Sequence, residues 1–246
     1  LLSVAYWIIR TDRLKAVVSG IKLFIHSYSF LQLSLFAIVF ISLMAVIVWQ
    51  VGVFDSLYYH QQNIRWNEEY AVVPGLGNIE HRFGFNSNYM LLSAIFSFRF
   101  LFGEAVYSLQ ALVLVIVVCW IIKEIISFGY DIRRVALLVI FTAYIFIFGY
   151  TITATSTDTI PNIVAIYLIA RLLLYPDRIR KDVLFLIFVP LSMITFKLSM
   201  IGLALIPLYM LWMQVKAKKY SNIVFPVSVA TLVIIFWCIR NVIITG

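Results

Sequence analysis

Charge is scarce in this sequence. Only 12% of the 246 residues are charged, whereas 63% are hydrophobic and the mean hydropathy is +1.02. So few polar side chains cannot cover the surface of a soluble domain, and the composition excludes that class. Several apolar runs reach or approach the roughly 18 to 20 residues that a helix needs to cross the hydrocarbon core. The sequence therefore predicts a polytopic membrane protein.

The apolar runs also lack the alternation of apolar and polar residues that a transmembrane strand needs. Continuous runs favour helices, so the expected fold class is an all-α transmembrane bundle. The sequence begins at Leu1 inside an apolar stretch, without a methionine, and stops at Gly246 just after another. We therefore expect residues 1–246 to be one membrane-embedded domain of a longer chain, and no signal peptide is assigned.

Cysteine is nearly absent. Cys119 and Cys238 are far apart and both sit in apolar runs, which favours simple burial over a disulfide, a zinc site or a thiol nucleophile. The stretch "VVPGLGN" is rich in turn-forming residues, but it has no GK[ST] and no preceding strand, which excludes a phosphate-binding P-loop.

Basic residues gather in four clusters that hold 14 of the 19 lysines and arginines. Because such clusters mark cytoplasmic loops, all four are predicted to lie inside. The members are Arg10, Arg13, Lys15 and Lys22; Lys123, Arg133 and Arg134; Arg171, Arg178, Arg180 and Lys181; and Lys216, Lys218 and Lys219.

One apolar segment between the first two clusters must then fail to cross the membrane. The segment 87–102 is short, carries Arg99, and runs into Gly103 and Glu104 without room for a polar turn. We predict that it is an interfacial or re-entrant helix on the outer side, with Arg99 reaching the headgroups. About seven spans remain, at roughly 30–51, 104–123, 135–151, 160–175, 183–196, 198–213 and 222–239.

This topology gathers nine ionisable residues on one side of the membrane. They are Asp55, Glu68, Glu69, Glu80, His81, Arg82, Asp158, Lys197 and Arg240. Charges near membrane depth are costly and are generally retained for a partner or a task. Ordinary interfacial residues at helix ends are the alternative for Asp158, Lys197 and Arg240. The sequence predicts a site on the outer face.

The longest polar interruption, residues 54–89, contributes most of that set. Asp55, Tyr59, Gln62, Trp66 and Glu69 recur at helical spacing and predict one face of a helix. Asp55 is either a helix N-cap or a carboxylate that accepts a proton from an attacking hydroxyl, while nearby basic residues hold a phosphate leaving group. His60 and His81 with these carboxylates leave a divalent cation open as a cofactor, although their spacing matches no strong metal pattern.

Five segments in order resemble the membrane-embedded GT-C glycosyltransferases, which use polyprenyl-phosphate-linked sugars. They are "FDSLYYH", "FRFLFGE", "TSTDTIP", "TFKLS" and "WCIRNVIITG", and together they span nearly the whole chain. The chain also resembles uncharacterised bacterial multispanning proteins that carry the same Val-Pro-Gly-Leu-Gly-Asn loop. The resemblance implies a GT-C-like bundle in the bacterial inner membrane, with a long first extracytoplasmic loop that carries interfacial helices.

The resemblance also implies roles for particular residues. Asp55 would be the general base toward the acceptor hydroxyl, and Asp158 a second acid that orients it. Lys197 and Arg240 would neutralise the lipid phosphate as it leaves. The expected substrate-binding set is completed by His81, Arg82, Glu69 and Tyr59. The expected partners are a polyprenyl-phosphate sugar donor, a glycan or lipid acceptor and membrane lipids, with no nucleic acid.

The sequence departs from that pattern in one place. Many GT-C relatives carry His-Pro-Pro or Pro-Pro-Leu before the interfacial helix, where this chain has "EHRFGFNSNY". Two alternatives to an enzyme therefore stay open: a transporter or flippase of lipid-linked glycans, and a noncatalytic assembly protein. Transport predicts broken helices or ionisable residues near the midplane, often in repeated halves. The sequence shows no convincing internal repeat, which favours the enzyme.

Overall fold

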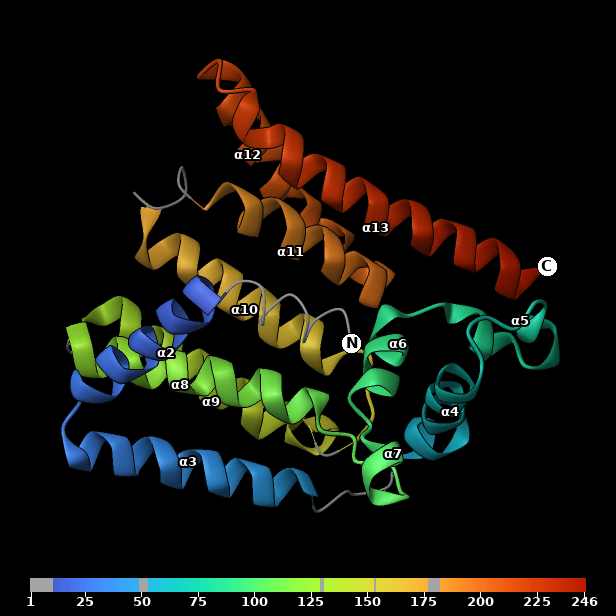
Figure 1. The fold of residues 1–246 in the computed structure, drawn as a ribbon, viewed down its shortest axis with the longest axis horizontal. Helices are drawn as coiled ribbons and strands as arrows, with labels where there is room; N and C mark the ends of the chain where they lie inside the picture. The colour runs from blue at the N-terminus through green and yellow to red at the C-terminus, as the bar shows by residue number, and fades with distance from the viewer. Residues whose placement is uncertain (1–10, 49–52, 129–130, 153, 177–181) are drawn as a thin grey trace. The chain divides into compact units, whose positions relative to one another are not determined.

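The computed structural model describes residues 11–48, 53–128, 131–152, 154–176 and 182–246, and every regular element in these ranges is a helix (Figure 1). The predicted all-helical fold is therefore confirmed for the described part of the chain. Two compact units divide the chain, residues 1–44 and 45–246. Arg10, Arg178, Arg180 and Lys181 of the basic clusters lie outside the described residues.

The first unit contains α2 (Thr11–His26) and most of α3 (Phe30–Val48). A reciprocal pair of hydrogen bonds fixes the start of α3. The backbone N–H of Ser29 donates to Gln32 Oε1 (2.9 Å), and the N–H of Gln32 donates to Ser29 Oγ (3.3 Å). This capping box satisfies donors that the first helical turn leaves unpaired, so the apolar run begins where the sequence predicts.

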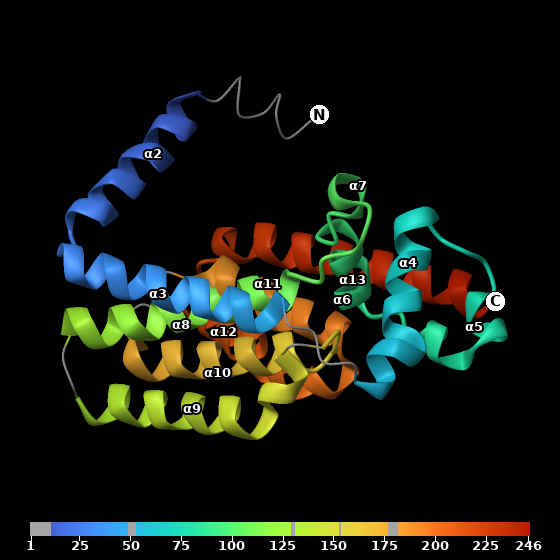
Figure 2. The same ribbon diagram turned by 90° about the horizontal axis from the view of Figure 1, so that it is seen from below.

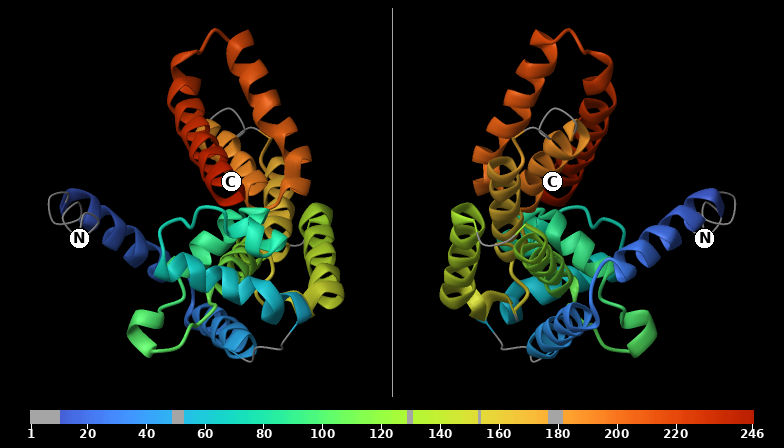
Figure 3. Two further views of the ribbon diagram at one scale, coloured as in Figure 1. Left: turned by 90° about the vertical axis from the view of Figure 1, so that its right-hand side faces the viewer. Right: turned by 90° about the vertical axis from the view of Figure 1, so that its left-hand side faces the viewer.

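The second unit is built around a helical bundle. Its long helices are α8 (Leu109–Phe128), α9 (Ile132–Ile152), α10 (Thr159–Leu174), α11 (Val183–Phe196), α12 (Leu205–Lys216) and α13 (Ser221–Thr245), with η4 (Leu198–Ala204) leading into α12. Figure 3 shows α12 and α13 as an antiparallel pair. Four stretches in the described residues, α8, α9, η4 with α12, and α13, are long and apolar enough to cross a membrane, which indicates a membrane protein. Crossing by α3, α10 and α11 stays a prediction.

Short helices cluster at one end of this bundle (Figure 2). They are η1 (Ser56–His60), α4 (Gln61–Glu69), α5 (Leu76–Ile79), η2 (His81–Phe85), α6 (Asn88–Ile95) and α7 (Arg99–Phe102). We call residues 53–108, with the connections that join α9 to α10 and α11 to η4, the loop end. The described members of the last three basic clusters lie toward the opposite end, which we predict to be cytoplasmic.

The predicted interfacial segment is divided into two helices. α6 has eight residues and α7 has four, and Phe98 between them has a φ of +51°. Eight residues rise about 12 Å, far less than the roughly 30 Å of a hydrocarbon core, so neither helix can cross. Arg99 donates from Nε to Glu68 Oε2 (2.7 Å), which attaches α7 to α4.

Apolar packing fixes the loop end on the bundle. One buried cluster joins Ile64, Tyr89 and Met90 to residues of the long helices, Leu109, Ile160, Met193 and Phe196. A second cluster joins Tyr59, Leu76 and Phe83 to Ile244 near the end of α13. Burying this apolar surface away from water, and the close packing that results, stabilise the loop end on the bundle. The polar loop is therefore a folded layer with a defined position on the long helices.

Glycine is needed at both glycine positions of "VVPGLGN", for a different structural reason at each. Gly75 has a φ of +69°, a conformation that favours glycine, and its N–H donates to Ile243 O (2.9 Å). Gly77 lies against the end of α13, since a Cβ there would meet Gly84 Cα at 3.2 Å and Ile244 O at 3.3 Å. The turn holds the loop close to α13.

Candidate functional site

An ion pair between Asp158 and Lys197 joins two connections at the loop end. Asp158 begins α10 and Lys197 ends α11, 39 residues later, and Nζ of Lys197 donates to Asp158 Oδ1. The side chains are 46% and 37% exposed, so the pair faces a space that a ligand can reach. Lys197, which has no opposite charge nearby in sequence, has Asp158 as its partner.

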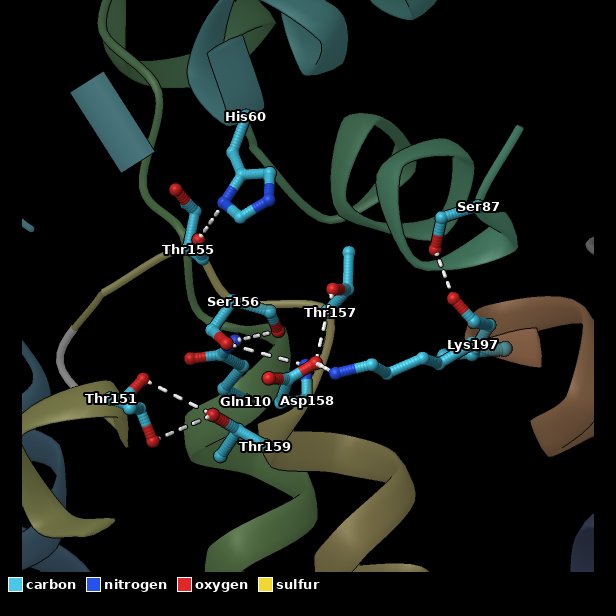
Figure 4. Close-up of polar contacts among 11 residues, drawn as sticks. His60, Ser87, Gln110, Thr151, Thr155, Ser156, Thr157, Asp158, Thr159 and Lys197 are labelled. Atoms are coloured by element: carbon cyan, nitrogen blue, oxygen red, sulfur yellow. Dashed lines mark hydrogen bonds and ion pairs between the residues drawn. The ribbon is translucent and has the colours of Figure 1, made fainter. Parts of the chain in front are cut away.

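The segment Thr155–Asp158 is held by hydrogen bonds from two helices, α8 and η1, and by one bond within the segment. Gln110 of α8 donates from Nε2 to Ser156 O (2.5 Å), and Ser56 of η1 donates from Oγ to Thr155 O (3.0 Å). The N–H of Asp158 donates to Ser156 Oγ (3.2 Å). Figure 4 shows His60 approaching this segment at Thr155 and Lys197 approaching it at Asp158. The carboxylate is therefore presented from a rigid turn.

His60 is a buried imidazole with a fixed orientation. Its side chain is only 4% exposed, and its Nδ1–H donates to Thr155 O (2.5 Å). Nε2 has no hydrogen-bond partner among the described residues. Burial lowers the pKa of His60. The hydrogen bond to Thr155 and the negative charges of Asp55 and Asp158 act in the opposite direction and raise it. The neutral ring thus keeps an unprotonated Nε2 that can accept a hydrogen bond or a proton.

Asp55 lies one helical turn before Tyr59, at the start of the same helical stretch. Its side chain is exposed and makes no cap hydrogen bond, so the N-cap alternative for Asp55 is wrong. The reason is that the backbone of Asp55 is already helical, with φ −62° and ψ −34°. The carboxylate makes no ion pair or hydrogen bond with the described residues. The carboxylate is therefore available to a ligand.

Asp55 and Arg82 both lie near the Tyr59 side chain. The Arg82 guanidinium sits 4.7 Å from the ring centroid of Tyr58 and 5.7 Å from that of Tyr59. Burial raises the pKa of Tyr59, and Asp55 raises it further while Arg82 opposes, so the phenol stays protonated at neutral pH. Arg82 also lies 4.0 Å from Glu80, so the guanidinium is held between aromatic faces and a carboxylate.

Arg240 is held by neutral partners. Its Nη1 donates to Asn86 Oδ1, and its Nη2 donates to Asn67 Oδ1 (2.7 Å). Nε is buried and has no partner, and no carboxylate pairs with Arg240 in the described part of the chain. Amide oxygens orient the guanidinium without cancelling its charge. A positive charge that the protein leaves uncompensated favours an anionic ligand.

An apolar pocket of about 480 Å³ begins at Arg240. It lies between α6, α11 and α13, and its polar rim consists of Arg240, Asn88, Thr195 and Ser192. Leu91, Phe188, Val233 and Phe236 are among the apolar residues that line the rest. The combination of a cation at the rim and a deep apolar wall suits an amphiphile with an anionic head.

Residues 86–88 connect the two cations. Asn86 binds Arg240 and also donates to Trp237 O (2.8 Å), both on α13. Ser87 donates to Phe196 O (2.6 Å), directly before Lys197, and Asn88 donates to Thr195 Oγ1 (2.7 Å). Because three consecutive residues bind the ends of α11 and α13, Lys197 and Arg240 flank the same short stretch of backbone.

Besides Arg82, which pairs with Glu80, two further members of the predicted set take other partners. Glu69 accepts from Arg65 Nε (2.7 Å) on the exposed face of α4, and His81 lies 3.0 Å from Glu80 with a side chain that is 75% exposed. The structure therefore brings together Asp55, Tyr59, Arg82, Asp158, Lys197 and Arg240 at the loop end, and it places Glu69 and His81 at its exposed margin. No group of three metal-binding side chains occurs in the described residues.

Comparison with known proteins gives a family. The family model described as Domain of unknown function (DUF8201) matches residues 1–246. The chain belongs to this family. No curated protein and no solved structure matches it.

The sequence prediction missed a buried polar stripe in this DUF8201 chain. Ser56, His60, Asn63 and Asn67 point into the protein, where they contact Thr155, Phe83 and Arg240. Their spacing of four, three and four residues is helical. The predicted face is mixed: Asp55, Gln62 and Glu69 are exposed, whereas Tyr59 is buried and Trp66 packs against the same buried cluster. The sequence does contain a signal for this stripe. Each of its polar side chains follows a residue of the predicted face by one position, so the stripe has the same helical spacing.

Proposed function

We propose that this protein is a membrane glycosyltransferase of the GT-C kind, which transfers a sugar from a polyprenyl-phosphate donor to a cell-envelope acceptor. The observation that carries the proposal is Arg240, a cation without an acidic partner in the described residues, at the rim of an apolar pocket. A polyprenyl phosphate has the matching parts, an anionic phosphate and a long apolar tail.

In the proposed reaction the acceptor hydroxyl attacks the anomeric carbon and the bond from that carbon to the phosphate oxygen breaks. Asp55 takes the hydroxyl proton, because its exposed carboxylate is not engaged by another described residue. Arg240 stabilises the negative charge that develops on the departing lipid phosphate. The charge of Lys197 is neutralised by Asp158. The pair offers hydrogen-bond donors and acceptors and is therefore suited to hold the sugar hydroxyls and the acceptor.

The proposal includes a position in the membrane. The loop end is the extracytoplasmic side, α6 and α7 lie at the interface, and the pocket opens toward the lipid tails of that leaflet. The exposed residues Ile95, Phe100, Leu101 and Phe102 support an interfacial place for these short helices. A membrane-borne donor can then enter sideways, with its phosphate at headgroup level.

The test is sugar transfer by the full-length protein in vesicles supplied with labelled polyprenyl-phosphate sugars. Arg240→Ala is expected to reduce transfer about 100- to 1,000-fold, the cost of removing one charge-stabilising donor. Asp55→Asn is expected to reduce it by a similar factor or more, about 100- to 10,000-fold, through loss of the base.

Two matched variants serve as controls. Arg65→Ala removes an exposed cation from the same loop, and Glu104→Gln neutralises an exposed acid at the same end. Both are expected to keep wild-type transfer. Undiminished transfer by Arg240→Ala and Asp55→Asn would remove the proposal. Movement of the labelled lipid across vesicles without a new glycosidic bond would replace it with the transporter alternative.

A further inference from the structure

A second apolar groove lies far from the loop end. It has a volume of about 870 Å³, within the roughly 300 to 1,000 Å³ typical of ligand sites, and lies between α9 and α10. Eleven of its twelve lining residues are apolar, and the twelfth is Arg133. Ile132, Ile140, Ile169 and Leu173 on its walls are all more than half exposed. The groove therefore offers a long apolar wall with one cation.

Arg133 and its neighbour Arg134 have different surroundings. Arg134 turns inward, where it pairs with Glu124 (3.4 Å) and with Asp131. Arg133 turns outward and donates from Nη1 to Leu173 O (3.4 Å), which holds the guanidinium at the head of the groove. It forms no ion pair with the described residues. One arginine is neutralised by the bundle, and the other remains available.

We infer that this groove binds an anionic phospholipid, with the phosphate on Arg133 and one acyl chain along α9 and α10. Charge complementarity identifies the occupant. A transmembrane helix would cover the wall but supply no anion for Arg133, and helix interfaces favour small residues whereas branched Leu and Ile dominate this wall. A phospholipid supplies the tail and the charge in the order that the groove presents them.

The site is independent of the proposed reaction. It lies at the end of α9 and α10 that we predict to be cytoplasmic, opposite Asp158 and Lys197. It binds a resident lipid of that leaflet, and the lipid fills the space between α9 and α10 at this end. At the loop end these helices meet directly, since Thr159 Oγ1 donates to Thr151 O (3.2 Å).

Native mass spectrometry of the full-length protein, titrated with phosphatidylglycerol or phosphatidylcholine, tests the inference. Wild-type protein is expected to retain phosphatidylglycerol in preference to phosphatidylcholine. Arg133→Ala is expected to lower that retention about five-fold, the effect of one cation near an anionic headgroup, with phosphatidylcholine unchanged. Lys123→Ala, a matched loss of an exposed cation on α8 outside the groove, is expected to behave as wild type.

A second variant tests the apolar wall without changing charge. Ala136→Trp places a large ring in the groove at an exposed position, so folding is spared, and it is expected to lower retention of both lipids. Equal retention of the two lipids by wild-type protein would overturn the inference. So would unchanged phosphatidylglycerol retention in Arg133→Ala and Ala136→Trp, or an equal loss in Lys123→Ala.

Discussion

At the scale of single residues, the loop end keeps two cations in different states. Lys197 has a carboxylate partner 39 residues away, whereas Arg240 is oriented by two asparagines, 154 and 173 residues away. Topology alone predicted that these side chains share one side, because basic anchors fix the direction of each span. It could not predict the partners, because amide contacts over such separations depend on packing that no local pattern encodes.

His60 is the residue whose state depends most directly on burial. Because burial lowers its pKa in the folded protein, the unfolded chain binds the proton more readily as the pH falls below the ordinary value of about 6.5. Stability is therefore lost on acidification through that value and is unaffected well above it. We expect His60→Gln, which keeps a donor for Thr155 O, to lack this loss.

The measurement is the thermal midpoint of the detergent-solubilised protein between about pH 5 and pH 8, a window that spans the ordinary histidine pKa. Wild type and His60→Gln should run parallel above about pH 7 and diverge below it. His81→Gln, which changes an exposed imidazole, is the control. Parallel curves over the whole range would show that His60 is not held neutral by burial.

At the scale of elements, helix 56–69 shows both the reach and the limit of sequence analysis. Helical spacing was recognisable, but the loop has polar residues on every side, so the pattern did not show which face packs inward. In the structure the inward face carries Ser56, His60, Asn63 and Asn67. Apolar contrast normally tells faces apart, and this helix has little of it.

The turn at Gly77 gives a prediction at the same scale. Gly77→Ala would bring a Cβ to 3.2 Å from Gly84 Cα and 3.3 Å from Ile244 O, and backbone atoms cannot move aside as a flexible side chain can. We expect a loss of stability of about 1–3 kcal/mol, typical of overpacking, seen as a lower thermal midpoint.

Gly149→Ala provides the comparison for Gly77→Ala. Gly149 lies in α9 with nothing within 4 Å of its added Cβ, and alanine favours a helix interior over glycine. Its thermal midpoint should therefore equal or exceed that of wild type. If Gly77→Ala is as stable as Gly149→Ala, the close approach of this turn to α13 does not require glycine at position 77.

At the scale of the whole molecule, the charge pattern makes a prediction about sides. The connections around Glu104 and Asp158 belong to the loop end, and Lys218 lies in the turn between α12 and α13 at the other. If basic clusters face the cytoplasm, these positions are separated by the membrane. The order of the helices in the sequence determines which ends of the described bundle helices lie together. Only the charge rule says which of these two ends faces the cytoplasm.

Single cysteines test this arrangement. In a background with Cys119 and Cys238 replaced by serine, Glu104→Cys is expected to react with a membrane-impermeant maleimide in intact cells. Lys218→Cys is expected to react only after the cells are permeabilised. The reverse pattern would place Asp55, Asp158 and Arg240 on the cytoplasmic side and would remove an extracytoplasmic donor from the proposed reaction.

The stretch Asn86–Asn88 has a consequence for how such a protein can diversify. Because it binds the last turn of α11 and also Trp237 and Arg240 of α13, the gap between Lys197 and Arg240 is set by three residues outside the long helices. In the proposed enzyme, exchanging this short stretch would alter which lipid headgroup fits, while the long helices stay as they are.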